Sequence, residues 1–441
     1  MTLLDSKALT KIQSIILIAI IAVAAIGGGV AYFVWNEEGQ SSKTIKIGVC
    51  ADLDMLIGKA THRGAILAAE QINQQGGLLG KTVEIIAVDS DGNSPAQDMI
   101  IGTEALARLI SIYNVDFIIT SDALYQLTYQ DIVSEHKKVL FGTSGSSNEY
   151  TQRVEDDYQR YKYYFRTAPN ATHALLGMTD CIVTLRDYSG FNKVAWLGPD
   201  LSYYTGLLPV VTNYLSEVHG FEIVYQDTYA LDTMDFSSYL AAVESSGAEL
   251  LVPFTAGQEG ILLVKEWYDR QSPFVIWGFN SYVGDYDGWE ITDGKCEHTT
   301  NVGFPTVTGY SLTSKTLDFR NAYFERWGEI PYSTAAIAYD TIRFILADAI
   351  ERAGTIETEA VINALEETSI ETSLAENFVF TPSHDVMGGE NINNPDKDHL
   401  VVMLFQWQNE EQVPMYPKSF KEEAGATYTF PDWPGPWDNI S

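Results

Sequence analysis

The chain has 441 residues, 27 of them lysine or arginine and 59 aspartate or glutamate, which gives a net charge of −32. At roughly 100–200 residues per domain, this length predicts two or three domains with cores of their own. Hydrophobic residues make up 46% of the chain and charged residues 20%, values that are typical of folded proteins and exclude a largely disordered chain. The acidic excess also argues against a nucleic-acid partner.

The first feature in chain order is an uncharged segment at residues 12–36. As a helix it would extend about 37 Å, enough to cross a hydrocarbon layer of about 30 Å. Aromatic side chains at Tyr32, Phe33 and Trp35 are typical of a membrane interface. A cleaved secretory signal has a shorter apolar region, about 7–15 residues, so we expect an uncleaved transmembrane anchor.

Charges on the two sides of this segment predict its orientation. Lysines at positions 7 and 11 precede it, and two glutamates follow it. Because positive charge stays on the cytoplasmic side, residues 1–11 are predicted to be cytoplasmic. Residues 37–44 are then a linker, and everything beyond them is predicted to lie outside the cell, so the protein would be a single-pass protein of the cell membrane.

From residue 45 onward, β-branched runs alternate with helical patterns, which is typical of α/β folds with parallel sheets. Strands are predicted at residues 45–50, 83–88, 115–120 and 139–141 and, after a crossover near residues 166–171, at 193–197, 222–225, 250–254 and 274–278. Helices are predicted between them, at residues 64–74, 99–110, 127–135, 206–218, 236–245 and 259–270. A long helix at 335–353 and a last strand at 400–407 follow. The pattern predicts two separately wound lobes.

The spacing of residues in this sequence does not match the known motifs for catalysis, cofactor binding or metal binding. The nucleophile elbow requires glycine two residues after the serine, but Ser146 occupies that place after Ser144. Neither the phosphate-binding loop nor the dinucleotide fingerprint occurs, and no two histidines lie three to five residues apart. The three cysteines are widely spaced and are expected to be isolated and buried. We therefore expect no enzyme activity, no cofactor and no metal.

A cluster of small polar residues follows the fourth predicted strand directly. It contains Ser144, Gly145 and Ser146. Ligands of open α/β sheets gather at the carboxyl ends of strands, and serine hydroxyls there can donate hydrogen bonds to a carboxylate. An ordinary turn would have the same composition, and the pattern alone leaves both interpretations open.

Several motifs resemble the branched-chain amino-acid-binding proteins, which are type I periplasmic solute-binding proteins of ABC transporters. The matching segments occur in order along the chain, at residues 45–49 (IKIGV), 63–77, 81–89, 164–169 (YFRTAP) and 380–386 (FTPSHDV). The resemblance implies two doubly wound α/β lobes joined by three crossover strands, with a ligand cleft between them that closes like a hinge. The implied limits are residues 45–168 and 304–378 for lobe 1, 169–303 and 379–418 for lobe 2, and 419–441 for a C-terminal tail.

The resemblance also implies a ligand site. It places Ser144 at a backbone-carbonyl position and Ser146 at a hydroxyl position of the first-lobe loop, and it places Tyr203 at an aromatic lid of the second lobe. The loops at Ala256 and Asn280 would select the rest of the ligand.

Three positions depart from the family pattern. Ile57 replaces a tyrosine, Leu124 replaces a serine, and Asn280 replaces the acid that binds an amino-acid ammonium group. Losing such a charge-assisted bond costs about 1.5–3 kcal/mol. Asp122, Glu259 or Asp285 could supply a substitute charge, and an amide, a polar neutral solute or an aromatic acid stays open as ligand.

These observations predict a membrane-anchored extracellular substrate-binding protein. Its partners would be a small solute, such as an amino acid, and an ABC permease with its ATPases. A ligand-sensing receptor or co-receptor has the same fold, and fold alone does not separate the two functions. An amidase is the third alternative, but the sequence offers no nucleophile and base for it.

Overall fold

The computed structural model describes residues 44–91, 99–255, 257–280, 282–284, 287–303, 310–390 and 398–440; at residues 202, 203, 302 and 303 it describes the backbone alone. Within these residues, every helix is too short or too polar to cross a membrane. The predicted membrane segment at residues 12–36 lies outside the described residues.

The first lobe is built on a parallel sheet of five strands in the order β2-β1-β3-β4-β5. Its strands are β1 (Thr44–Ala51), β2 (Thr82–Asp89), β3 (Phe117–Thr120), β4 (Val139–Gly142) and β5 (Tyr164–Arg166). The helices that connect them are α2 (Leu56–Gln74), α3 (Met99–Ser111), α4 (Gln126–His136), α5 (Glu149–Asp156) and α6 (Tyr158–Tyr161). Strands β3, β4 and β5 are buried throughout, as expected for a sheet covered on both faces.

The second lobe is built on a seven-stranded sheet in the order β14-β13-β10-β9-β8-β6-β7. Its strands are β6 (Lys193–Pro199), β7 (Glu222–Tyr229), β8 (Leu250–Thr255), β9 (Val275–Asn280), β10 (Thr300–Gly303), β13 (Met403–Gln408) and β14 (Glu411–Tyr416). Its helices are α7 (Ala171–Ser189), α8 (Ser202–His219), α9 (Ser237–Ser246), α10 (Glu259–Arg270), α11 (Gly288–Ile291), α17 (Lys418–Glu423) and the 3₁₀ helix η2 (Pro436–Asn439). Strand β13 pairs antiparallel with both β10 and β14, and the other described strand pairs of this sheet are parallel.

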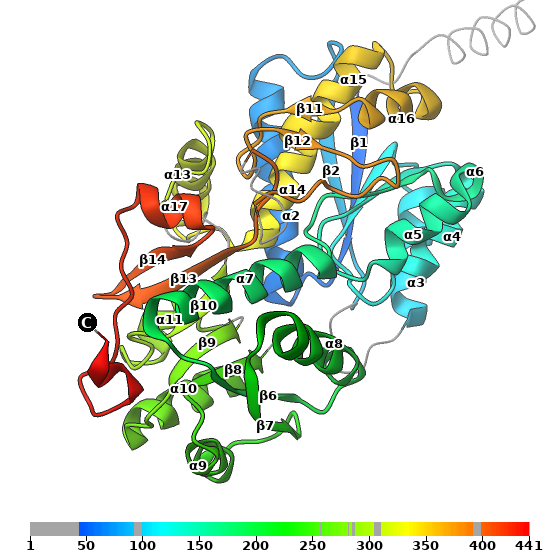
Figure 1. Cartoon of the computed structure of the whole chain (residues 1–441). Coiled ribbons are helices and arrows are strands. Elements are labelled where there is room, and N and C mark those ends of the chain that lie inside the picture. The colour runs from blue at the N-terminus through cyan, green and yellow to red at the C-terminus, as the bar shows by residue number, and fades with distance from the viewer. Residues whose placement is uncertain are drawn as a thin grey trace, which may run out of the picture.

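Between β10 and β13 the chain returns to the first lobe. The returning elements are α13 (Thr316–Trp327), α14 (Ser333–Asp340), the π-helix η1 (Thr341–Leu346), α15 (Ala347–Ala353), α16 (Thr358–Glu366), β11 (Ser369–Ile370) and β12 (Phe378–Val379). In Figure 1 the helices α14–α16 lie with β1 and β2 of the first lobe, whereas β13 and β14 lie with the second. The predicted architecture of two α/β lobes, each built on its own sheet, is confirmed.

The two lobes have separate hydrophobic cores, and these cores place the boundaries differently from the sequence resemblance. Phe380, Val386 and Leu400, which the resemblance assigned to the second lobe, pack in the first core. A short turn at residues 381–385, bridged by Phe380 and Val386, packs against β5 and explains this contact.

The C-terminal residues form part of the second lobe and not a separate tail. Trp433 packs on Trp267 with ring centroids 5.2 Å apart, and its indole nitrogen donates to the carbonyl of Ser272 at 3.0 Å. Tyr428 lies against Trp277, 5.4 Å between centroids. Aromatic side chains bury large apolar areas, so this segment contributes to the stability of the second lobe.

Candidate functional site

The candidate binding loop begins where β4 ends, at Gly142. A Cβ atom there would lie 2.4 Å from Gln126 Oε1 and 2.5 Å from the Tyr164 hydroxyl, so glycine is required for these side chains to approach. The next residue, Thr143, is buried, and both its backbone nitrogen and its hydroxyl donate to the carbonyl of Thr120 in β3, at 2.9 and 3.0 Å. The start of the loop is therefore fixed to the sheet.

Gln126 holds the middle of the loop through hydrogen bonds. This fully buried amide donates from Nε2 to the carbonyl of Ser144 at 2.5 Å and accepts from the Tyr164 hydroxyl at 2.5 Å. The carbonyl of Ser144, which the resemblance assigned to the ligand, already accepts one hydrogen bond within the protein. A carbonyl has two lone pairs, so one stays available.

The Ser144–Ser146 segment presents small polar groups at the surface. Gly145 has φ of +84°, a conformation that glycine adopts without strain. Ser144 is half-buried, and Ser146 is exposed. The carbonyl of Ser146 accepts from the backbone nitrogen of Ala171, 2.7 Å away, at the start of α7. The loop thus displays two hydroxyls while its backbone is tied to the first helix beyond the lobe.

Two further predicted site residues lie on the same edge of the first sheet. Ile57 is half-buried in the first turn of α2, and its carbonyl accepts from the hydroxyls of Thr61 and Thr334 at 2.9 and 3.0 Å. Leu124 follows β3 and is 55% exposed. Both side chains are apolar where the family pattern has hydroxyls, so this edge offers apolar contact beside the serines.

Asp122 is buried beneath this edge. Tyr129 donates its hydroxyl proton to Asp122 Oδ2 at 2.7 Å, and Cys50 Sγ lies 3.9 Å from the same oxygen. Burial raises the pKa of the Asp122 carboxyl to about 6. Because the side chain has no exposed surface, Asp122 is poorly placed to replace the missing ammonium-binding acid.

In the second lobe, Asn280 ends β9 and is 1% exposed. Its Nδ2 donates to the carbonyl of Gly260 at 3.1 Å, and its Oδ1 accepts from the backbone nitrogen of Val283 at 3.1 Å. Both ends of the amide therefore connect β9 to α10 and to the following turn.

Thr255, at the end of β8, lies next to Asn280 as its partner in the register of β8 and β9. Its hydroxyl is buried and has no hydrogen-bond partner among the described residues. A Cβ on Gly260 would lie 2.4 Å from Asn280 Oδ1 and 2.5 Å from Thr255 Oγ1, so glycine is needed in α10 for these strand ends to pack beneath it.

Aromatic rings cover the neighbouring strand ends. Phe254 and Phe279 are half-buried and stack with centroids 4.7 Å apart at 18°, and Tyr204 packs against Phe254 at 5.7 Å. The predicted lid residue Tyr203 lies in the first turn of α8, and its side chain is outside the described part of the chain, as is Ala256. The second lobe thus supplies an apolar surface at its edge.

Glu259 lies in the first turn of α10 and is 8% exposed. Its Oε1 accepts from the backbone nitrogen of Gly257 at 3.0 Å and lies 3.4 Å from the Tyr229 hydroxyl. This carboxylate therefore lies over the carboxyl ends of β7 and β8. Asp285, the third substitute acid, lies outside the described residues.

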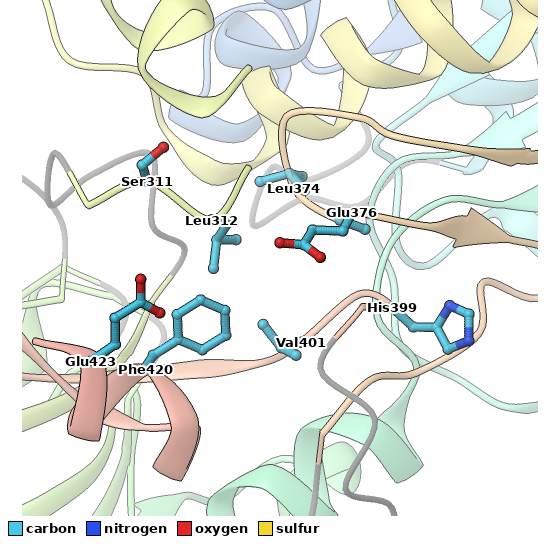
Figure 2. A pocket seen from close by; sticks show the side chains of 9 residues that line it. Ser311, Leu312, Leu374, Glu376, His399, Val401, Phe420 and Glu423 are labelled. Atoms are coloured by element: carbon cyan, nitrogen blue, oxygen red, sulfur yellow. The ribbon is translucent and has the colours of Figure 1, made fainter. Parts of the chain in front are cut away.

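A small cavity of about 100 Å³ lies away from the binding loop, beside the segment that leads from the first lobe to β13. Figure 2 shows Leu312 and Leu374 on one side and Phe420 with Glu423, from α17, on the other, while the Glu376 carboxylate points toward the middle. Its lining comes from both lobes.

Comparison with known proteins agrees with the observed fold. A model of the periplasmic binding protein family matches residues 44–391. This chain belongs to that family. Leu/Ile/Val-binding protein homolog 7 of Brucella abortus is 25% identical over 410 residues, which cover 90% of this chain and 95% of the relative.

Solved structures of this family share the fold at low identity. The branched-chain amino acid transporter substrate-binding protein of Streptococcus pneumoniae, in complex with isoleucine, has a TM-score of 0.68 at 18% identity, covering 84% of this chain and 97% of that one. A solute-binding protein of R. palustris in complex with benzoate has a TM-score of 0.65 at 15% identity, covering 84% and 95%.

Sequence reasoning placed the serine loop at the edge of the sheet but missed the residues that hold it. Gln126 and Tyr164 carry no local signal, because Gln126 bonds to Ser144 across 18 residues and Tyr164 bonds to Gln126 across 38. The glycine at position 142 was the available hint, since a glycine at a strand end often marks a close approach.

Proposed function

We propose that this protein is the extracellular substrate-binding component of an ABC transporter, which binds an amino acid or a similar small polar solute between its lobes and delivers it to the permease. In this proposal residues 12–36 anchor the protein in the membrane, with residues 1–11 inside the cell. Binding and release, and not catalysis, are its activity.

The observation that carries this proposal is the serine loop after β4. Exposed Ser146 and half-buried Ser144 offer hydroxyl donors, and the hydrogen bond from Gln126 to the carbonyl of Ser144 holds their backbone in place. A pre-formed loop loses little conformational freedom when a ligand binds, which favours affinity. We assign the carboxylate or other polar head of the ligand to this loop.

The rest of the ligand is assigned by chemistry. The half-buried rings of Phe254 and Phe279, with Leu124 from the first lobe, favour an apolar side chain or an aromatic group. If the ligand carries an ammonium group, we assign that group to Glu259, because Asn280 is neutral and already bonded at both ends of its amide.

Titration calorimetry of the purified full chain tests this proposal against the twenty amino acids, their amides, urea and benzoate. We expect one class to bind at micromolar concentration, and no heat at millimolar concentration of any amino acid would contradict the amino-acid assignment. Replacing Ser146 by alanine should weaken binding by about one to two decades, the value of a hydrogen bond to a charged group. Ser245→Ala, at an exposed position of α9 in the second lobe, is the matched control and should bind as the wild type does.

A further inference from the structure

Two motifs that matched the family in sequence, at residues 164–169 and 380–386, meet in the structure through one buried ion pair. Arg166, at the end of β5, has no exposed side-chain surface, and Asp385 is only 7% exposed. Arg166 Nε donates to Asp385 Oδ1 at 2.8 Å, and Nη2 donates to Oδ2 at 2.6 Å. The two parallel bonds form the bidentate geometry that is strongest for this pair.

The remaining hydrogen bonds of the pair reach the binding loop and the first crossover. Arg166 Nη1 donates to the carbonyl of Ser147 at 2.5 Å, and Nη2 lies 3.2 Å from the Thr151 hydroxyl in α5. On the other side, Asn170 Nδ2 donates to Asp385 Oδ2 at 2.7 Å. Asn170 precedes α7, the first helix of the second lobe, and its Oδ1 caps that helix by accepting from a backbone nitrogen.

The turn that carries Asp385 is itself attached to β5. His384 stacks on Phe165 with centroids 3.9 Å apart at 8°, and its carbonyl accepts from the backbone nitrogen of Arg166 at 2.9 Å. The His384 ring also bonds to the carbonyl of Tyr164 through Nδ1, at 3.0 Å. Asp385 is therefore held in place independently of the ion pair.

A buried ion pair is a poor source of net stability, because removing two charges from water costs about as much as their attraction returns. The role of this pair is therefore better sought in the geometry it imposes than in the energy it adds. All of its described partners lie in the binding loop with α5, in the residue before α7, or in the turn at residues 381–385.

We propose that Arg166 and Asp385 are positioning residues that hold the Ser144–Ser147 loop in its ligand-binding shape and connect it to the segments about which the lobes close. Ligand binding at the loop and closure of the lobes are coupled through this pair. The coupling to ligand affinity rests on the proposed function, whereas the hold on the loop does not.

Hydrogen exchange of the ligand-free full chain tests the hold on the loop. The reporter is the backbone amide of Ala171, which donates to the carbonyl of Ser146, together with amides of residues 143–152. In Asp385→Asn, which keeps the shape of the side chain but removes its charge, we expect these amides to exchange at least tenfold faster, while those of α10 in the second lobe stay unchanged.

The control separates this effect from general destabilisation. Ile362 is buried in α16 of the first lobe, outside the binding loop and the ion-pair turn, so Ile362→Ala loosens the lobe without touching the pair. If the loop amides exchange no faster in Asp385→Asn than in Ile362→Ala at equal stability, the proposal is overturned. Should Asp385→Asn fail to fold, Arg166→Lys, which keeps the charge but cannot form the bidentate contact, is tested in its place.

Calorimetry on the same variants tests the coupling. With an amino acid that binds the wild type, Asp385→Asn should weaken affinity about tenfold or more, the size of one charge-assisted hydrogen bond. Faster exchange of the loop with unchanged affinity would overturn the coupling. If the wild type binds no amino acid, the proposed function fails, and the exchange experiment still decides whether the pair holds the loop.

Discussion

In the first lobe the candidate binding edge is held by polar contacts from several elements, whereas in the second lobe the matching edge combines one buried amide with stacked aromatic rings. Gln126 and Arg166 reach the serine loop from α4 and β5. On the opposite side, Asn280 ties β9 to α10, and Phe254 stacks on Phe279.

This difference suggests a division of roles between the lobes. A polar head group needs hydrogen-bond donors in fixed directions, which the first lobe supplies through its braced loop. An apolar group needs only surface to cover it, and aromatic rings can provide this with little directional demand. The first lobe would therefore fix the common head of the ligand, and the second lobe would select what the head carries.

The largest effect is expected from the C-terminal segment of the second lobe. Trp433→Ala removes a side chain packed on Trp267 and Tyr268, and such a loss costs about 3–5 kcal/mol of unfolding free energy. Hydrogen exchange should rise in the second lobe and stay unchanged in the serine loop. Phe324→Ala, an aromatic residue that is 52% exposed, should cost far less. Equal losses from the two variants would show that the C-terminal segment is not part of the core.

The next effect concerns the loop itself. In Gly145→Ala the new Cβ would lie 2.8 Å from Gln126 Nε2 and 3.1 Å from Tyr150 Cε2, on a backbone with φ of +84°. A non-glycine residue in this conformation costs about 1–2 kcal/mol, and the crowding adds to it. We expect ligand affinity to fall by at least tenfold in calorimetry, with the second lobe unaffected.

Gly354→Ala is the matched control for that variant. Gly354 ends α15 with φ of +64°, and nothing lies within 4 Å of its added Cβ. Gly354→Ala should lower the free energy of unfolding, because alanine is strained in this backbone conformation, but it should keep the full ligand affinity. Equal loss of affinity in both variants would mean that stability of the first lobe, and not the shape of the loop, controls binding.

A third prediction uses pH to test the polar interior of the first lobe. Because the pKa of folded Asp122 is raised to about 6 from an ordinary value of 3.8, the folded state binds its proton more tightly than the unfolded state does. The stability from this group is present below about pH 4 and is lost as pH rises through 6, an effect of up to about 3 kcal/mol.

Asp122→Asn should remove this contribution, because the amide oxygen can still accept from Tyr129 but carries no charge. Urea unfolding at pH 5 and pH 8 measures it, and the variant should gain stability relative to the wild type at the higher pH. The comparison must be between variants, since His298, whose pKa burial lowers to about 4, acts in the opposite direction. Glu84→Gln, an exposed position on β2, is the control. A constant difference at both pH values would contradict the prediction.

The sequence was most informative where structure depends on local patterns. Helix α10 begins and ends where its apolar spacing predicted, at Glu259 and Arg270, and strand β1 extends the predicted run by one residue at each end. The contacts that support the binding edges could not be read in this way. The approach of Gln126 to Ser144, and of Arg166 to Asp385, joins residues distant in sequence, and neither contact leaves a periodic trace.

The smallest expected effect addresses the position where the family acid is missing. Asn280→Asp restores a carboxylate there, and if this side chain met the ligand directly, affinity for an amino acid would rise. The structure favours the opposite result. The new oxygen would face the carbonyl of Gly260, which now accepts from Nδ2, so two acceptors would meet in a buried site at a cost of about 1–3 kcal/mol. For Asn280→Asp we expect a lower midpoint of urea unfolding and no gain in affinity. Glu259→Gln, in contrast, should weaken the binding of ammonium-bearing ligands and leave the binding of benzoate unchanged. A gain in affinity from Asn280→Asp would move the ammonium site from Glu259 to the end of β9, and the second lobe would then bind part of the polar head as well as the apolar group.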